Sequence, residues 1–278
     1  MRQRRLFLQS VRGVAALAMA IVAFFPFYWI VNTSMTPADE LYSGGQSVWL
    51  DLSRAQYAFQ ILTTESPFLR WLGNSAVVAT GTTILSVLLA LLAAYALSRF
   101  RFAGKGLFSF IFFSSQMLPE ALIIVPLYAL FVSLQLLNQP AGLVLANTAF
   151  SMPVAVWILK AAIDGVPLEI EESARVDGCG PMKTLRYMVL PIIAPSIAAA
   201  AVIAFFDSWN EYLFATTFMR TKSLWLASTG LASFQGEYQT PLDVVFSGAF
   251  VFSLPAVIFF LIVQKRIVAG LTAGSVKG

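Results

Sequence analysis

The chain carries six apolar runs that are each long enough to cross a lipid bilayer. A membrane-spanning helix needs about 20 predominantly apolar residues. Lipid offers the backbone no hydrogen-bond partner, so such runs fold as helices rather than as open strands. The runs cover roughly residues 14–35, 71–97, 107–133, 141–162, 191–214 and 243–264. We therefore expect an all-α polytopic membrane protein, with six transmembrane helices in a single domain that covers residues 1–278.

Composition agrees with this class. Hydrophobic residues make up 58% of the chain and charged residues 12%, whereas about a quarter of a soluble domain is charged. The first run continues through Phe24, Phe25, Phe27 and Trp29, which is longer and more aromatic than the core of a typical signal peptide. We expect it to be retained as the first span.

The basic residues predict the orientation, because cytoplasmic loops carry an excess of Lys and Arg. With six spans, 14 of the 18 Lys and Arg residues fall on the side that holds both termini and the loop between spans four and five. We expect that side to be cytoplasmic, and loops 36–70 and 215–242 to face outward. The net charge of +4 is thereby explained by topology and indicates no nucleic-acid partner.

Neither a metal centre nor a catalytic centre is predicted. The chain has no His, which is the commonest metal ligand and general base, and Cys179 is its single cysteine. Cys179 lies in a predicted cytoplasmic loop, where we expect a reduced thiol.

That loop, residues 163–190 between spans four and five, is a polar segment in an otherwise apolar chain. Pro167 can open a short helix whose acidic first turns suit the positive end of the helix dipole. Gly178 can close this helix in a left-handed conformation, and Pro181 can open the next one. We expect two short helices joined at a sharp corner, with Pro191 separating the second from the fifth span.

The spacing within the loop is specific. Glu172-Ser173-Ala174 is followed by three residues, Gly178, nine residues, Met188, one residue and Leu190-Pro191. This resembles the EAA loop of permease subunits of binding-protein-dependent ATP-binding cassette importers, with Ser173 and Met188 as mild departures. The residues to which the resemblance assigns ATPase coupling are Glu171, Glu172, Ser173, Ala174, Asp177, Gly178, Leu190 and Pro191.

The resemblance implies a coupling helix seated on a separate ATPase. The segment from Gly178 to Thr184 has Met182 where a phosphate-binding loop needs Gly before its Lys, so this chain itself is expected to bind no nucleotide and no cofactor. ATP and Mg²⁺ are expected on the partner. The implied partners are a second permease subunit, an ATP-binding cassette ATPase dimer, an extracytoplasmic solute-binding protein and membrane lipids.

Two further segments resemble the carbohydrate, maltose-type smaller permeases. The tail 264–278 is similar to a tail that reaches toward the ATPase dimer, and the alternative is a frayed basic terminus. The segment around Trp209 and Asn210 is similar to the W-N-aromatic region of sugar permeases, and Asn74-Ser75 also matches.

Ionisable residues within spans usually face an interior or an aqueous cavity. Glu120 stands near the middle of the third span, where Pro119 and Pro126 are expected to cause kinks or gaps. Asp207 and Glu211 are four residues apart and are expected on one helix face. Carboxylates, amides and aromatic rings together suit a polyol, although these residues could instead be interfacial or structural. The candidate path residues are Asn74, Glu120, Phe206, Trp209, Asn210 and Glu211.

The sequence thus predicts a permease subunit of an ATP-driven carbohydrate importer in a bacterial or archaeal cell (inner) membrane, forming half of the translocation path. One alternative is the same importer class carrying polyol phosphates of the glycerol-3-phosphate type. Others are an ion-coupled secondary transporter that uses Glu120, and a non-transporting membrane scaffold.

Overall fold

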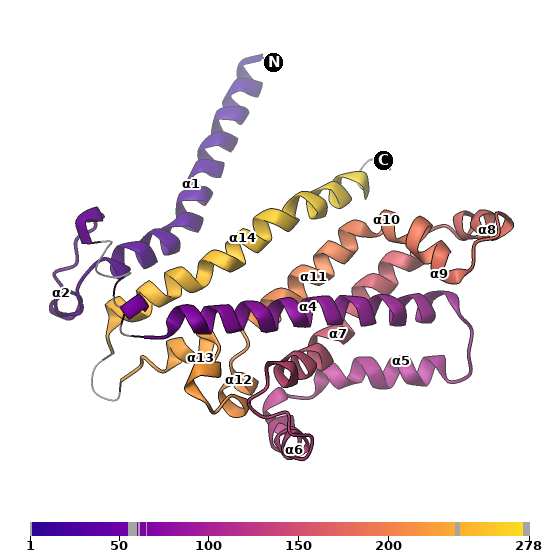
Figure 1. Ribbon diagram of the computed structural model, residues 1–278. Helices are drawn as coiled ribbons and strands as arrows, with labels where there is room; N and C mark the ends of the chain where they lie inside the picture. Colours follow the sequence, from indigo (N-terminus) through magenta and orange to yellow (C-terminus); the bar gives the residue numbers. More distant parts are fainter. Residues whose placement is uncertain (1, 55–59, 61, 65, 237–239, 275–278) are drawn as a thin grey trace. The chain divides into compact units, whose positions relative to one another are not determined.

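The computed structural model describes residues 2–54, 60, 62–64, 66–236 and 240–274, and the side chains of the described residues within 9–265 (Figure 1). None of these residues forms a β-strand, which confirms the all-α prediction. The longer helices are α1 (Arg2–Ser34), α4 (Phe68–Arg99), α5 (Lys105–Ser114), α6 (Glu120–Ser133), α7 (Pro140–Asp164), α11 (Ala194–Trp209) and α14 (Leu242–Gly274).

Four described helices are long and apolar enough to cross a membrane, within Gln9–Ser34, Phe68–Arg99, Pro140–Asp164 and Leu242–Lys265. Two bent helix pairs, Lys105–Met117 with Glu120–Ser133 and Pro181–Ile192 with Ala194–Trp209, bring the number to six if each pair is one span. This agrees with the predicted six spans, and it adds that the third and the fifth are bent.

The bend in the third span is 104° and lies at Leu118-Pro119. Proline has no N–H to donate and its ring clashes with the preceding turn, so the helix stops before Pro119 and a new one starts at Glu120. The predicted kink at Pro119 is thus a complete break. By contrast, Pro126 lies inside α6.

The last helix is longer than the predicted span 243–264. The backbone of α14 stays helical to Gly274, beyond Lys265 and Arg266. Charged residues end an apolar run but have good helix propensity, so the hydropathy signal stops before the helix does. Of the predicted docking tail, residues 275–278 lie outside the described residues.

The chain divides into two compact units, one of Met1–Leu69 with Leu231–Leu254 and one of Arg70–Gly230 with Pro255–Gly278. In the first unit, the end of α1 contacts the start of α14, where the Ser247 hydroxyl donates to the Ser34 carbonyl at 3.2 Å. The connection after α1 holds the short helix α2 (Ala38–Ser43), whose Glu40 pairs with Arg54 at 2.9 Å.

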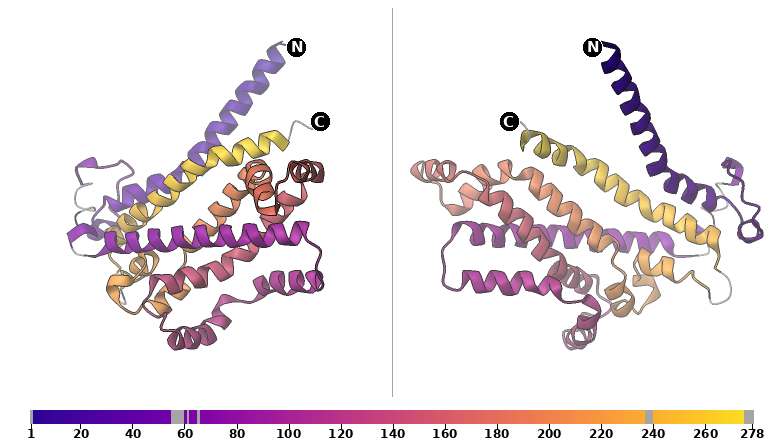
Figure 2. Two further views of the ribbon diagram at one scale, coloured as in Figure 1. Left: turned by 45° about the vertical axis from the view of Figure 1, so that its right-hand side comes forward. Right: turned by 180° about the vertical axis from the view of Figure 1, so that it is seen from behind.

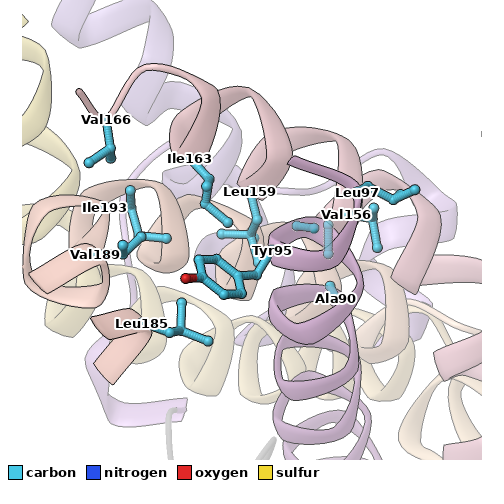
Figure 3. Close-up of a cluster of buried hydrophobic side chains, with 13 residues drawn as sticks. Ala90, Tyr95, Leu97, Val156, Leu159, Ile163, Val166, Leu185, Val189 and Ile193 are labelled. Carbon is cyan, nitrogen blue, oxygen red and sulfur yellow. The ribbon is translucent and has the colours of Figure 1, made fainter. Parts of the chain in front are cut away.

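In the second unit, α5 runs back in the direction opposite to α4, and α7 packs against α11 (Figure 2). One cluster of buried side chains joins α4 and α7 to the helical segments between Leu185 and Ala200 (Figure 3). It includes Tyr95 and Leu97 of α4, Leu159 and Ile163 of α7, and Val189.

Small polar side chains link three helices of this unit. Ser86 of α4 and Ser151 of α7 share a hydrogen bond of 2.6 Å. Asn147 of α7 donates to Ser208 of α11 at 2.9 Å, and Ser208 donates to Thr82 of α4 at 3.2 Å. Such bonds between helices hold membrane bundles together where apolar contacts gain little over lipid. They fix the helices around the cavity described below.

Candidate coupling loop and membrane cavity

The polar loop folds as the predicted helical corner. Helix α8 (Leu168–Val176) begins after Pro167 and ends at Val176, and Gly178, two residues later, has a φ of 81°. The Gly178 N–H donates to the Arg175 carbonyl at 3.0 Å and the Cys179 N–H to the Ala174 carbonyl at 2.9 Å. This pair of bonds is the Schellman motif, which requires a left-handed residue at the position of Gly178. The predicted left-handed conformation of Gly178 is confirmed.

The second half of the corner differs from the prediction at Pro191. Helix α9 (Pro181–Thr184) continues through a π-helical turn (Leu185–Val189) into α10 (Leu190–Ile192). The bend of 83° toward α11 comes after Ile192 rather than at Pro191. Proline is tolerated in a first helical turn, which is where Pro191 lies in α10.

A buried ion pair anchors the loop to the rest of its unit. Arg99 Nε, at the end of α4, lies 2.6 Å from Glu171 Oε1 of α8, and the side chains are 8% and 0% exposed. Arg99 Nη2 also donates to the carbonyls of Ile163 and Val166 at 2.7 and 2.9 Å. The Tyr95 hydroxyl, visible in Figure 3, donates to the other carboxylate oxygen of Glu171 at 3.1 Å. Glu171 therefore faces the chain's own helices.

The other residues predicted to couple to the ATPase fall into a buried group and a solvent-exposed group. Ala174 is buried beside Glu171. Glu172, Ser173, Asp177 and Gly178 are exposed, as is Pro191, and Leu190 is half-buried. Glu172, Ser173, Asp177 and Gly178 lie on α8 and its corner, so the exposed surface there is available to a partner.

A second feature is a cavity of about 620 Å³ within the second unit. Its walls come from the break between α5 and α6, from α7, and from α11 with the segment after it. Of the predicted path residues, Glu120, Phe206, Asn210 and Glu211 line it, together with Asp207. The volume falls within the ~300–1,000 Å³ typical of small-molecule sites.

The prediction that Asp207 and Glu211 share one helix face is wrong. Helix α11 ends at Trp209, and Glu211 lies beyond it. The Glu211 carboxylate accepts hydrogen bonds from the N–H groups of Phe214 and Ala215 at 2.5 and 2.9 Å. These donors lie in the first turn of α12 (Leu213–Phe218), where they lack intrahelical acceptors. Glu211 thus caps the next helix while it borders the cavity.

Two predicted path residues do not line the cavity. The Asn74 amide donates to the carbonyls of Ser223 and Trp225 at 3.1 and 2.9 Å, which ties α4 to the connection before α13 (Ala227–Ala232). Trp209 is 1% exposed, and its ring stacks on Phe205 at 5.5 Å between centroids. Both residues support the packing of the unit.

Sequence reasoning missed Asn147, Ser151 and Ser208, which line the cavity on its buried side. Each is a small polar residue within an apolar helix, and that is the only local signal they carry. Among the described residues, no group of His, Cys, Asp or Glu is arranged to hold a metal ion.

Comparisons with known proteins place this chain among membrane transport components. Residues 86–272 match the family described as "Binding-protein-dependent transport system inner membrane component". The chain is 31% identical to the sulfoquinovosyl glycerol transport system permease protein of Agrobacterium fabrum, over 97% of this chain and 94% of that one. It is 31% identical to the trehalose transport system permease protein of Mycobacterium tuberculosis (92% and 93% covered). The same identity is found with the trehalose/maltose transport system permease protein of Thermococcus litoralis (95% and 95% covered).

The fold also matches a solved structure. A chain of a bacterial ABC transporter involved in the import of the acidic polysaccharide alginate superposes with a TM-score of 0.75 at 20% identity, covering 95% of this chain and 98% of that one. A second alginate transporter structure, in complex with an alginate-bound periplasmic protein, gives a TM-score of 0.63 at 17% identity, covering 95% and 96%.

Proposed function

The chain belongs to the family of binding-protein-dependent transport system inner membrane components, and from this premise we propose that it forms half of the translocation path of an ATP-driven carbohydrate importer. Members of this family are multi-pass transport components of the inner membrane and not enzymes. The observation that carries the proposal is that one unit of this chain holds both the anchored α8 corner and a polar cavity.

A carbohydrate substrate is supported by the cavity and by the relatives. Carboxylate and amide oxygens of Glu120 and Asn210 can accept hydrogen bonds from hydroxyl groups, and the rings of Phe206 and Tyr212 can pack on the C–H faces of a sugar. Relatives from three organisms are described as permeases for sulfoquinovosyl glycerol, for trehalose and for trehalose and maltose.

The α8 corner is the proposed contact to the ATPase. Glu172, Ser173 and Asp177 present polar groups on its exposed surface, while Glu171 and Ala174 hold the opposite side inside the unit. Because Arg99 ties α8 to the ends of α4 and α7, a push on the exposed surface would move these helices together. ATP and Mg²⁺ would be bound by the partner, whose closure would switch the path between inward-facing and outward-facing states.

The proposed complex also contains a second permease, an ATPase dimer and an extracytoplasmic solute-binding protein, in contact with membrane lipids. Apolar side chains on α5 and α6, among them Phe110, Ile111, Leu122 and Val125, are exposed in the single chain and are free to meet lipid or the second permease. The basic residues support cytoplasmic termini. We also propose that residues 1–278 form a single transmembrane domain.

The alternatives account less well for the structure. A polyol phosphate would need cationic groups, and none of the described residues that line the cavity is Lys or Arg. An ion-coupled carrier would use Glu120 but has no need of an anchored docking corner. A scaffold would have no need of a polar cavity.

Uptake by the reconstituted complex tests the proposal. The chain would be assembled in proteoliposomes with its partner permease, ATPase and solute-binding protein, and uptake of labelled trehalose, maltose and glycerol 3-phosphate measured. We expect uptake of a sugar that needs ATP and survives collapse of the proton gradient, in the wild type and largely in Glu120→Gln, whose amide still offers an acceptor. Loss of wild-type uptake on collapsing the gradient, with ATP held constant, would favour the ion-coupled carrier.

A further inference from the structure

Three amide side chains at the cavity wall each use an N–H group for a hydrogen bond within the chain. The amide nitrogen of Gln116 donates to the Phe150 carbonyl at 2.8 Å, and that of Asn210 to the Phe206 carbonyl at 2.9 Å. The Asn147 amide nitrogen donates to Ser208 at 2.9 Å. Each of these side chains also carries an amide oxygen, which can accept a hydrogen bond from a ligand.

Asn147 gives the clearest sign of a missing donor. Its side chain is 6% exposed, it borders the cavity, and its Oδ1 atom has no hydrogen-bond partner. A buried carbonyl oxygen left without a donor costs about 1–3 kcal/mol. A ligand that donates a hydrogen bond at this wall would remove that cost.

The charges of the cavity have one sign. Glu120 and Asp207 both line it, and within the described part of the chain neither carboxylate has a hydrogen-bond or ion-pair partner. Glu211 also lines it, but its oxygens already accept the N–H groups of Phe214 and Ala215. No described lining residue is cationic.

We propose that this cavity is a substrate subsite for carbohydrates that bear a protonated amino group, and that it disfavours anionic sugars. The inference rests on the proposed function and narrows its substrate class. An ammonium group has three donors and no acceptor, which complements the carboxylates of Glu120 and Asp207 and the oxygen of Asn147. The carboxylate of a uronate, or a phosphate group, would instead bring only acceptors and a negative charge that Glu120 and Asp207 repel. The ring hydroxyls of the same sugar can meet the remaining amide oxygens.

The rate of thiol modification measures whether the cavity favours cations over anions, and this measurement does not depend on transport. Val154 lines the cavity and is half-buried, so Val154→Cys in a Cys179→Ser background places one thiol there. In the full chain within the assembled importer, reaction rates would be compared for a cationic and an anionic methanethiosulfonate of similar size. A cleft of one charge sign raises the local concentration of counter-ions by about tenfold or more.

Comparison between variants cancels the intrinsic difference between the two reagents. The ratio of cationic to anionic rate should fall about tenfold in Glu120→Gln/Asp207→Asn. The matched control, Asp39→Asn/Glu169→Gln, removes two exposed acids outside the cavity and should leave the ratio unchanged. An equal ratio in all three proteins would overturn the proposal.

Protection of the same thiol tests the ligand class. Glucosamine, glucose and glucuronate would be added at equal concentration during modification by the anionic reagent. We expect glucosamine to slow the reaction most, glucose less and glucuronate not at all, and this order to vanish in Glu120→Gln/Asp207→Asn. Equal protection by the three sugars, or protection by none, would contradict the subsite.

The two proposals fail differently. If the charge ratio and the order of protection hold while the complex shows no ATP-driven uptake, the importer assignment is wrong and the cavity assignment stands. If ATP-driven sugar uptake occurs but glucuronate protects as well as glucosamine, only the selectivity is wrong.

Discussion

Arg99 Nε lies 2.6 Å from Glu171 Oε1, and both side chains are buried, although the two residues are separated by 72 positions in the chain. The pair joins the end of α4 to the first turns of α8 and, through Arg99 Nη2, to the end of α7. The buried ion pair between Arg99 and Glu171 therefore anchors the EAA-like corner to α4 and α7.

Breaking this pair from one side should destabilise the second unit. Removing one partner of a buried ion pair leaves an uncompensated charge and typically costs 3–5 kcal/mol, so Arg99→Met should lower the unfolding temperature markedly in detergent. The double variant Arg99→Met/Glu171→Leu should lose less, since no buried charge remains. Arg101→Met, which removes a neighbouring exposed basic residue, is the control. Equal losses for Arg99→Met and Arg101→Met would show that the pair does not anchor the loop.

Gly178 and Gly180 provide a matched pair for the helical corner. A β-carbon would meet no heavy atom within 4 Å at either position, but φ is 81° at Gly178 and −74° at Gly180. Only the first is strained by a side chain, at a cost of about 1–2 kcal/mol. Gly178→Ala should therefore speed hydrogen exchange of the Cys179 amide, which bonds to the Ala174 carbonyl, by at least about fivefold.

Gly180→Ala should leave that exchange unchanged. The coupling role predicts that only Gly178→Ala weakens stimulation of ATP hydrolysis by the permease. Full coupling in both variants would separate the geometry of the corner from the proposed function.

The backbone preferences of single glycine and proline residues predicted several of the corners and breaks in this fold. The left-handed position of Gly178 and the break at Pro119 each follow from the backbone limits of one residue type. By contrast, hydropathy does not give the end of α11, because a window that averages over Asn210 and Glu211 still includes the apolar Leu213 and Phe214. The helix nevertheless ends at Trp209, and the Glu211 carboxylate starts a new one.

The hydrogen-bond and ion-pair partners of buried polar side chains could not be predicted from the sequence either. Glu171 was predicted as a coupling residue from its place beside the EAA-like pattern, but nothing local indicates that Arg99 neutralises it. Likewise, Asn147 meets Ser208 across 61 positions only once α7 and α11 pack together. Pairing between such distant residues depends on how the helices pack together, and the local sequence pattern of one segment does not show this.

Close packing at the start of α7 gives a further test. A β-carbon on Gly142 would lie 2.6 Å from the Leu136 carbonyl oxygen and 3.1 Å from Phe131 Cε1. Because the first of these atoms belongs to the backbone, Gly142→Ala should cost about 1–3 kcal/mol through overpacking. At Gly73 of α4 a β-carbon meets nothing within 4 Å, and Gly73→Ala should stabilise the helix by about 0.5–1 kcal/mol. Thermal unfolding of both variants in the same detergent measures this, and a loss at Gly73 as large as at Gly142 would contradict the packing.

Cys179 reports the orientation of the loop, because it is the only cysteine in the chain and is partly exposed next to the Gly178 corner. The excess of Lys and Arg on its side of the membrane predicts a cytoplasmic position. A membrane-impermeant maleimide should therefore label Cys179 in opened cells and not in intact spheroplasts. In a Cys179→Ser background, Thr221→Cys places the thiol at an exposed position in the predicted outer loop and should give the reverse result, with labelling of intact spheroplasts. Labelling of Cys179 in intact spheroplasts, with Thr221→Cys protected, would invert the proposed topology and place the α8 corner on the side opposite to any cytoplasmic ATPase.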